Sequence, residues 1–400
     1  MSNDTANLKS VMERNEGIFR LLPSWVPRTF CIPGKRLKLH PDDYYAFGAH
    51  RGGIDERWFA STVKADNGPL TLEDEGLSYI ALEESEQPDK ILLKEAVGLM
   101  GDEILGKDVM KAHGEWAMFA KFFDNMEPLP HHLHQNDESA ARVGQKGKPE
   151  GYYFPRQLND HAAYFPYTFF GLNPGTTKED VKRCLENWEK GDNGILYLSH
   201  AYKLKLGTGW NVPPGGLHAP GTYLTYEPQR ASDVFAMFQS LVWDRVLGWD
   251  MVIKDVPEQY KHDLDYIVSL IDWDLNLDPA FYKNRFLEPK PVLQVGEMRD
   301  QGYEEYWVVY NTEFFGAKEL TVLPGREVRI KDPAAYGIIV IEGHGTFGKL
   351  PIESSNMIRF GQAAKDELFV TQDAAGGGIV IKNTSEVEDL VMLKHFGPEA

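Results

Sequence analysis

Cysteine is scarce in this chain, with only Cys31 and Cys184 among 400 residues. Two cysteines so far apart cannot form the disulfide framework that holds small secreted domains together. The sequence also lacks an apolar leader at its polar start, and no uninterrupted apolar run approaches the length needed to span a bilayer. We therefore expect a cytoplasmic protein with no role in a membrane.

Positive charge is the second deficit. Lysine and arginine number 42 against 60 aspartates and glutamates, which gives a formal net charge of −18, and no basic cluster stands out. An acidic surface repels nucleic acid, so we expect no nucleic-acid partner. It also exerts no long-range attraction on a phosphorylated substrate, although a local pocket overrides that field within about a Debye length.

A closely spaced pair of histidines is the first positive signal. His132 and His134 are two apart in the run Pro-Leu-Pro-His-His-Leu-His. On a β-strand this spacing puts both imidazoles on one side, as two ligands pointing into a barrel require, whereas a helix would separate them. The pair therefore predicts two metal ligands that point into a barrel from one strand.

A third histidine follows a turn. Gly207, Pro213 and Gly215 punctuate the stretch before His218 and place it at the start of the next predicted strand. The spacing Gly-x5-Pro-x-Gly-x2-His resembles in full the second signature of the cupin barrels. Together with the His-x-His pair, it predicts one divalent-metal site inside a β-barrel.

Two glutamates compete for the role of carboxylate ligand. Glu138 is close behind His134, but the residues after it favour a helical turn or loop. Glu150 follows a Lys-Gly-Lys-Pro turn and opens an aromatic run of high β propensity, so a barrel strand would carry it inward. We choose Glu150 as the ligand and keep Glu138 as the alternative.

The competing interpretation is that these histidines are ordinary core or surface residues. That is the correct default for any single histidine, and it would leave no metal site. Four potential ligands in one arrangement of strands and turns favour the metal site instead.

The first 300 residues alternate strand-like and helical patterns. Residues 1–40 read as an irregular or partly helical arm, and residues 232–286 carry apolar side chains at helical spacing. Between them we expect an edge strand at 54–61, helices over 90–113 and about 176–190, and strands at 116–123, 195–206 and 221–226.

The pattern of predicted secondary structure changes after residue 300. Short β runs separated by Gly and Pro turns predict a second all-β unit, with strands and turns spaced as in a small jelly roll. The expected strands are 306–310, 314–322, 327–330, 337–342 and 379–383. Because no His-x-His pair occurs there, we expect no metal in this unit.

Taken together, these blocks resemble the type I phosphomannose isomerases, a bicupin family. The family's Ile-Gly-Glu-x-Trp-x-x-Ser block is similar to residues 54–61, its Lys-x-x-Asp to Gln-x-His stretch to 121–134, and its Gly-Lys-Thr-Glu to 147–150. Its Pro-x-Gly-x-x-His-Ala turn is similar to residues 213–219, and its metal-free C-terminal cupin to 311–400. The blocks keep the family's order.

The resemblance implies a mainly β fold of two cupin jelly-roll barrels with an inserted helical segment. Residues 1–230 would include the metal-binding barrel, 231–300 the helical insertion and 301–400 the metal-free barrel. It also implies one divalent ion, zinc first, with manganese, iron, cobalt or nickel also suited to three histidines and one glutamate. His132 takes the place of the family's glutamine ligand.

Two further residues match family positions that handle protons. Lys148 matches the lysine two before the ligand glutamate, and Glu227 matches an active-site acid nine residues beyond His218. Either could act as the base, Glu227 if burial raises its pKa or Lys148 if burial and the metal's charge lower its pKa. The structural alternatives are that Glu227 is a strand carboxylate paired with Arg230 and that Lys148 is a solvated lysine.

The departures from the family bear on the substrate. The family's arginine after Ala-Ser-Asp falls on Met237, and the tyrosine after His-Ala falls on Pro220, with Tyr223 on the same run. Arg285 is the candidate replacement for the lost arginine. The lack of an arginine fork that clamps phosphate weighs against a phosphosugar substrate.

The sequence leads to three functional hypotheses. The first is a metal-dependent aldose–ketose isomerase acting on a sugar or sugar phosphate, similar to mannose-6-phosphate isomerase. The second is another cupin metalloenzyme, an epimerase, lyase or oxygenase. The third is a non-catalytic sugar-binding cupin that kept the metal and lost the arginine.

Overall fold

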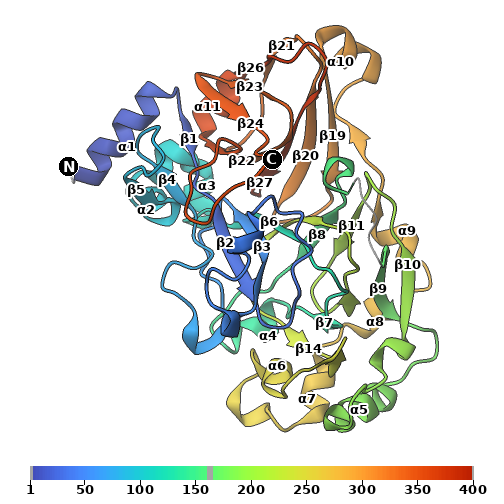
Figure 1. The fold of residues 1–400 in the computed structure, drawn as a ribbon. Coiled ribbons are helices and arrows are strands. Elements are labelled where there is room, and N and C mark those ends of the chain that lie inside the picture. Colours follow the sequence, from blue (N-terminus) through green and yellow to red (C-terminus); the bar gives the residue numbers. More distant parts are fainter. Residues whose placement is uncertain (1–2, 160–164, 399–400) are drawn as a thin grey trace.

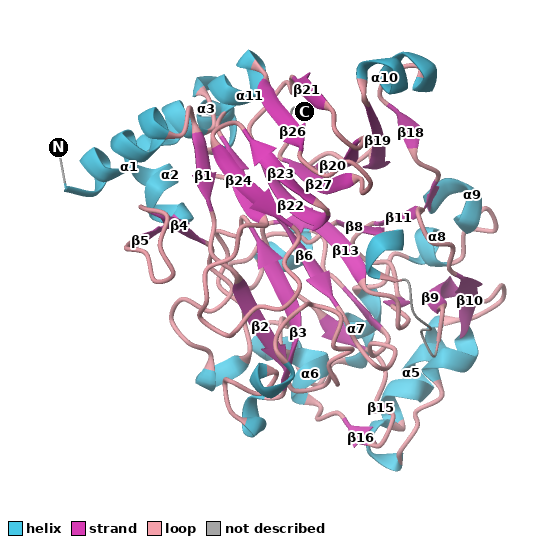
Figure 2. Ribbon diagram, turned by 45° about the horizontal axis from the view of Figure 1, so that its top comes forward, coloured by secondary structure: helices cyan, strands magenta, loops and turns pink. Residues whose placement is uncertain are grey.

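Antiparallel β-sheets dominate the fold, and most helices lie at its margins (Figures 1 and 2). The structure is a computed structural model that describes residues 3–159 and 165–398. A seven-stranded sheet and a smaller sheet form each half of the molecule. The chain is thus mainly β, as the sequence predicts.

The first half contains a seven-stranded sheet, in the order β17-β11-β8-β13-β6-β3-β2, and a five-stranded sheet, in the order β10-β9-β12-β7-β14. The strands of the larger sheet are β2 (Ser24–Arg28), β3 (Gly53–Phe59), β6 (Met118–Phe123), β8 (Glu150–Tyr153), β11 (Gly209–Val212), β13 (Thr225–Arg230) and β17 (Phe286–Leu287). Those of the smaller are β7 (His132–Leu133), β9 (Tyr167–Leu172), β10 (Ser199–Lys203), β12 (His218–Ala219) and β14 (Ala236–Met237).

The second half pairs a seven-stranded sheet, β1-β25-β22-β27-β20-β19-β18, with the four-stranded sheet β21-β26-β23-β24. The larger sheet has β1 (Ile18–Arg20), β18 (Lys290–Pro291), β19 (Tyr303–Val309), β20 (Gly316–Val322), β22 (Tyr336–Glu342), β25 (Glu367–Val370) and β27 (Leu390–Phe396). The smaller has β21 (Glu327–Ile330), β23 (His344–Phe347), β24 (Leu350–Glu353) and β26 (Ile379–Asn383).

Strand alternation divides the large C-terminal sheet between two cores. On β27, Leu390 and Met392 belong to the core that the four-stranded sheet closes with Phe347 and Ile381. The alternate residue Leu393 belongs to a different core, which it shares with side chains of the first half such as Phe59, Met118 and Tyr226. The two seven-stranded sheets therefore pack back to back and join the halves.

Helices cover the outer face of the five-stranded sheet. α5 (Lys178–Glu186) and α7 (Leu264–Ser269) contribute Val181, Leu185 and Val268 to a core that also contains Leu133 of β7. The remaining helices are α1 (Asn3–Arg14), α2 (Leu93–Ile104), α3 (Lys107–His113), α4 (Asp137–Ala141), α6 (Asp250–Ile253), α8 (Trp273–Asn276), α9 (Phe281–Arg285), α10 (Val295–Gln301) and α11 (Gln372–Gly377). Two short hairpins complete the fold, β4 (Tyr79–Ala81) with β5 (Lys90–Leu92) and β15 (Leu241–Val242) with β16 (Arg245–Val246).

Local sequence signals locate several elements accurately. Thr177 and Asp180 form a reciprocal capping box at the start of α5, and the expected strands 327–330 and 379–383 are β21 and β26. The expected helix over 90–113 is divided at Gly106, whose φ of 89° is incompatible with a continuous helix. The stretch 195–206 begins with a short 3₁₀ helix before β10.

One local expectation is wrong. Residues 54–61 do not form an edge strand, because β3 lies between β2 and β6 and every residue of it is buried. Glu56 pairs with Arg28 and Lys121, and Arg57 pairs with Asp366, which allows a strand of polar composition to occupy the interior of a sheet.

Strand pairing also crosses the predicted domain boundaries. β1 pairs with β25, so a segment from the N-terminal arm belongs to the C-terminal sheet. Within 231–300, β14 and β17 join the sheets of the first half, and β18 joins β19 of the second. Division at residues 230 and 300 remains a prediction. Among the described residues, every helix is too short or too polar to cross a membrane.

Candidate metal centre

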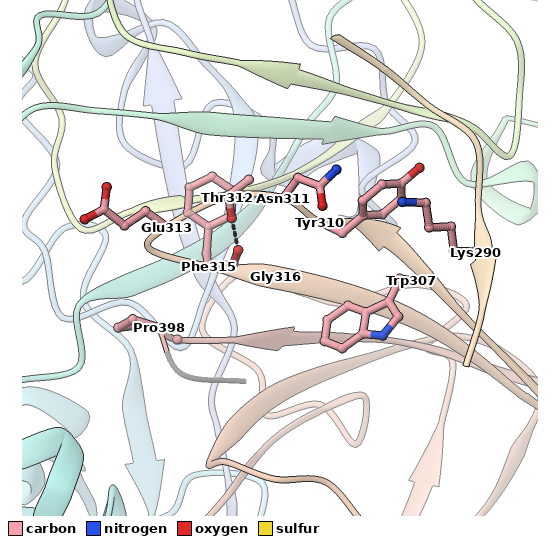
Figure 3. Close-up of a pocket in the computed structure, with 10 residues that line it drawn as sticks. Lys290, Trp307, Tyr310, Asn311, Thr312, Glu313, Phe315, Gly316 and Pro398 are labelled. Atoms are coloured by element: carbon pink, nitrogen blue, oxygen red, sulfur yellow. Dashed lines mark hydrogen bonds between the residues drawn. The ribbon is translucent and has the colours of Figure 1, made fainter. Parts of the chain in front are cut away.

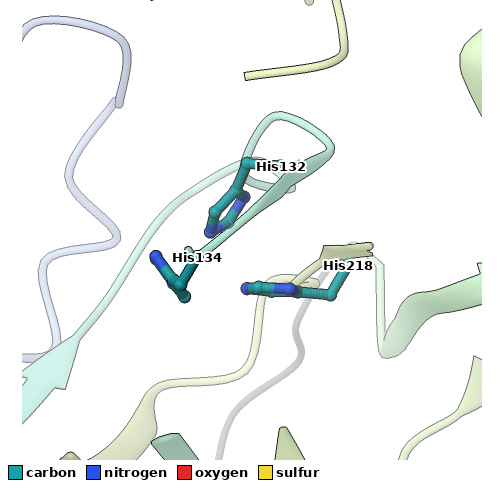
Figure 4. A group of neighbouring side chains, drawn as sticks. All are labelled: His132, His134 and His218. Carbon is teal, nitrogen blue, oxygen red and sulfur yellow. The ribbon is translucent and has the colours of Figure 1, made fainter. Parts of the chain in front are cut away.

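Three of the predicted ligands converge between the two sheets of the first half. His132 is in β7, His134 directly follows that strand, and His218 opens β12, which pairs with β7 through His132 (Figure 4). All three side chains are buried, and each offers a ring nitrogen within 4.8 Å of the other two. The two-residue spacing thus directs both imidazoles to one place, as the sequence predicts.

Each imidazole is held by a carbonyl oxygen on its far side. Nδ1 of His132 lies 2.6 Å from Pro130 O, that of His134 2.7 Å from Val234 O, and that of His218 2.8 Å from Gly216 O. Because a carbonyl only accepts, each Nδ1 carries the ring hydrogen and each Nε2 keeps its lone pair. Burial also lowers the pKa of His134 to about 4, which keeps this imidazole neutral.

Glu150 completes the group. It opens β8, its Oε2 lies 3.0 Å from Nε2 of His134, and its Oε1 lies 3.1 Å from Nε2 of His218. Burial alone would raise the pKa of Glu150, but its charged surroundings, with the Lys148 ammonium among them, hold it well below its usual range. The Tyr152 hydroxyl donates a 2.6 Å hydrogen bond to Oε1 and orients the carboxylate.

This donor set fits a divalent cation. Neutral imidazoles and an ionised carboxylate are the groups that bind zinc and its neighbours in the transition series. Oε2 of Glu150 and Nε2 of His218 are buried, and neither has a hydrogen-bond partner among the described residues. A buried polar atom that forms no hydrogen bond is costly, and a cation placed between the two atoms would satisfy both, in addition to the ion pair that Oε2 forms with Lys148.

The alternative carboxylate lies elsewhere. Glu138 is in α4, its side chain is 79% exposed, and it forms an ion pair with Arg142 of the same helical segment. It does not reach the histidine cluster. The structure therefore brings Glu150, and not Glu138, to the three imidazoles.

Both predicted proton-handling residues lie beside this group. Lys148 Nζ is 3.2 Å from Glu150 Oε2 and 3.8 Å from Glu227 Oε1, and both side chains are buried. Burial first, and then the charge of Glu150, raises the pKa of Glu227 to about 8. Glu227 does not pair with Arg230, which binds Asp137 instead. Neither structural alternative holds for these two residues.

A second layer of charges was missed by sequence reasoning. Lys121 lies 3.3 Å from Glu227 and 3.2 Å from Glu56, and Arg28 binds both Glu56 and Asp233. Lys121 and Glu56 fall inside the blocks that carry the family resemblance, and Asp233 ends the Ala-Ser-Asp motif, so these segments contained a usable signal. Arg28 lies outside them, and nothing in its local sequence marks it.

The predicted ligands and the charged residues around them border a small cavity of about 40 Å³, which has room for an ion and a few water molecules. It is lined by Arg28, Phe30, Glu56, Lys121, Leu129, Pro130, His132, His134, Lys148, Glu150, Tyr152, Glu227, Asp233, Phe235 and Met237. Met237 lies on β14, where it pairs with His132. Arg285, at the end of α9, and Tyr223 are not among these lining residues, so the nearby guanidinium is that of Arg28.

Comparison with known proteins identifies the fold. No protein-family model matches the chain, and no curated protein matches it. Solved structures match over nearly the whole chain. The mannose 6-phosphate isomerase of Bacillus subtilis is 17% identical with a TM-score of 0.60, covering 95% of this chain and 99% of its own. That of Salmonella typhimurium, bound to its substrate and to a zinc atom, is 12% identical with a TM-score of 0.60, covering 96% and 100%.

The fold is that of the mannose 6-phosphate isomerases. At such low identity the likeness concerns the course of the chain alone, and it agrees with the resemblance drawn from the sequence blocks.

Proposed function

We propose that the chain is a metal-dependent sugar isomerase that interconverts an aldose and a ketose. The observation that carries the proposal is the convergence of three Nε2 lone pairs and one ionised carboxylate beside a glutamate whose pKa lies near neutrality. His132, His134, Glu150 and His218 would hold one ion, with zinc as the first candidate. The paired sheets of each half are then the two barrels of a bicupin.

Isomerisation moves a proton between neighbouring carbons, and a bound divalent ion would stabilise the negative charge that develops on the sugar oxygens. Glu227 is the proposed base, since an acid with a pKa of about 8 both accepts and returns a proton near neutral pH. Lys148 and Lys121 flank its Oε1 and orient it. Lys148 remains the alternative base.

We propose an unphosphorylated sugar as the substrate. Met237 occupies the position of the family's arginine, and Arg28 directs its terminal nitrogens to Glu56 and Asp233. Lys121 and Lys148 are likewise committed to carboxylates. A phosphate dianion would have to displace one of these buried carboxylates, at a cost that a neutral hydroxyl does not incur.

The test combines elemental analysis with an NMR assay for aldose–ketose conversion. Purified protein should contain about one zinc or other divalent ion per chain and should convert mannose more efficiently than mannose 6-phosphate. Preference for the phosphate would overturn the substrate proposal, and absence of metal would overturn the function.

The donor set of three histidines and one glutamate also favours a second candidate, an iron-dependent oxygenase or lyase of the cupin type. Turnover that requires iron and consumes oxygen would establish that alternative. Metal with saturable sugar binding and no conversion would instead indicate a sugar-binding protein.

A further inference from the structure

A second cavity lies on the opposite side of the five-stranded sheet from the metal centre. On β12, His218 points inward, so Ala219 points outward, and on β9 the same alternation separates Phe170 from Phe169. The ring of Phe170 lies 6.3 Å from that of His218, centroid to centroid. Phe169 instead stacks on Phe165 at 5.9 Å.

The outward side chains line a groove of about 440 Å³, a size typical of small-molecule sites. Its lining is almost entirely apolar and consists of Glu127, Pro128, Leu129, Phe165, Phe169, Leu196, Ala219, Gln239, Val242 and Trp243. Trp243 is the tip residue of the β15–β16 hairpin, with a φ of 59° and an indole that is 56% exposed. A bulky residue rarely adopts this backbone conformation, and Arg245 fixes the hairpin by donating to Thr29 O and Cys31 O.

Glu127 is the one charged residue in this described lining. It is only 8% exposed, and no hydrogen bond or ion pair reaches its carboxylate from any residue that the structure describes. The backbone on either side is anchored, because Met126 N donates to Ile32 O and Leu129 N donates to Pro220 O. Burial raises the pKa of Glu127 to about 7, the behaviour of a carboxylate that lacks a cation.

Gln239, the other polar lining residue, is already satisfied. Its Oε1 accepts from His131 N, and its Nε2 donates to Leu241 O. Within the part of the chain that the structure describes, the groove thus offers one unpaired carboxylate among aromatic and aliphatic surfaces. A positive charge attached to an apolar body complements both features, since aromatic faces and carboxylates each attract cations.

We propose that this groove binds a small organic cation with an apolar body, such as an arylalkyl ammonium ion. The ammonium group lies beside Glu127, and the apolar part lies against Phe165, Phe169 and Trp243. Neither the metal centre nor the isomerase function is required for this binding.

A third cavity, of about 320 Å³, provides a contrast within the same molecule (Figure 3). It also combines aromatic rings, Trp307 and Tyr310, with a carboxylate, Glu313. There, however, the Lys290 ammonium lies 3.9 Å from the centroid of the Tyr310 ring. That cavity already holds its own cation, so we expect it to bind no added one.

The test measures binding of benzylamine and of its neutral analogue benzyl alcohol to the purified full chain by isothermal titration calorimetry. Benzylamine should bind roughly ten- to a hundredfold more tightly, the range expected for a hydrogen bond to a charged group. Glu127→Gln keeps the shape of the side chain and should abolish that preference. Trp243→Ala should weaken both ligands.

Glu313→Gln is the matched control and should leave benzylamine binding unchanged. Trp243 is exposed, so its replacement keeps the site testable even if Glu127→Gln fails to fold. Equal affinity for the two ligands, no binding of benzylamine, or full binding by Trp243→Ala would overturn the proposal.

Discussion

The two halves of the molecule have sheets of similar arrangement, but their interiors differ in which buried polar groups they contain. Between the sheets of the first half lie three imidazoles and a carboxylate that present lone pairs. Between those of the second lie two ammonium groups, Lys318 and Lys394, whose side chains share the face of Leu320 and Met392. Lys394 Nζ is 2.6 Å from both Glu305 and Asp332, and Lys318 Nζ is 2.7 Å from Asp332.

The difference between the two interiors shows which groups a cation site requires. Carboxylates occur in both interiors, so acidic groups alone do not create one. Lysines supply positive charge to carboxylates in both interiors, Lys148 to Glu150 in the first half and Lys394 to Glu305 in the second. The first interior adds three imidazole nitrogens beside its carboxylate, and these lone pairs leave a place for an added ion. The expectation of a metal-free second unit rests on its lack of a His-x-His pair, and it stays a prediction.

The largest effect should come from removing a ligand of the first interior. His134→Ala should abolish both metal retention and isomerase activity, because one of three converging nitrogen donors is lost. The matched control is His344→Ala, which removes an exposed histidine of β23 in the second half and should leave the metal content intact. Stoichiometric metal in His134→Ala, measured by elemental analysis, would refute the ligand assignment.

Glu227→Gln should separate catalysis from metal binding. We expect kcat to fall by roughly a hundred- to ten-thousandfold, the range for loss of a general base, with the metal content unchanged. Glu319→Gln replaces a partly buried strand glutamate, one that accepts a hydrogen bond from Tyr153 away from the site, and should keep kcat. A kcat within a few-fold of wild type in Glu227→Gln would move the proton transfer to Lys148.

Disrupting the lysine cluster, formed by Lys318, Lys394, Glu305 and Asp332, should lower stability and leave the metal content unchanged. Lys394→Met leaves Glu305 with only the 4.0 Å contact to Lys318, and we expect unfolding free energy to fall by about 3–5 kcal/mol. Urea unfolding measures the loss. Combining it with Glu305→Gln removes the uncompensated charge and should restore part of the stability, and a double variant as unstable as the single one would contradict this account.

The junction between the halves should respond to pH. Glu367 of β25 lies 3.4 Å from Arg57 of β3, and burial, opposed by Arg57, raises the pKa of Glu367 from 4.5 to about 8. The folded state therefore keeps a proton that the unfolded state releases, so this group's contribution to stability is full below pH 4.5 and is lost as pH rises to about 8.

Glu367→Gln does not titrate. The stability of wild type relative to this variant should decline by up to roughly 1.4 kcal/mol per pH unit across that window. Urea unfolding at pH 5, 6.5 and 8 measures the decline, and a constant difference between the two proteins would refute it.

The smallest expected change is a gain. Met237→Arg places a guanidinium beside His132 at the position of the family's arginine, and should raise turnover of mannose 6-phosphate relative to mannose by a few-fold. The NMR assay reports the ratio. An unchanged ratio in a folded, metal-loaded variant would mean that Met237 does not determine selectivity for phosphate.

Local sequence was sufficient to bring together the residues of the candidate metal centre. Three local features determine which way the ligand side chains point: the spacing of His132 and His134, the turn before His218 and the turn before Glu150. Each acts through strand alternation, which operates within a few residues. The capping box of α5 is also local, because Thr177 and Asp180 are only three residues apart.

What only the tertiary structure decided are contacts between distant segments. Arg28 meets Asp233 across 205 residues, β1 joins β25, and β3 becomes an interior strand because β2 and β6 pair with it on both sides. No described residue pairs with the carboxylate of Glu127, and the lysine cluster forms where β19, β20 and β27 converge. Burial and partner choice arise from packing of the whole chain, and no local pattern encodes them.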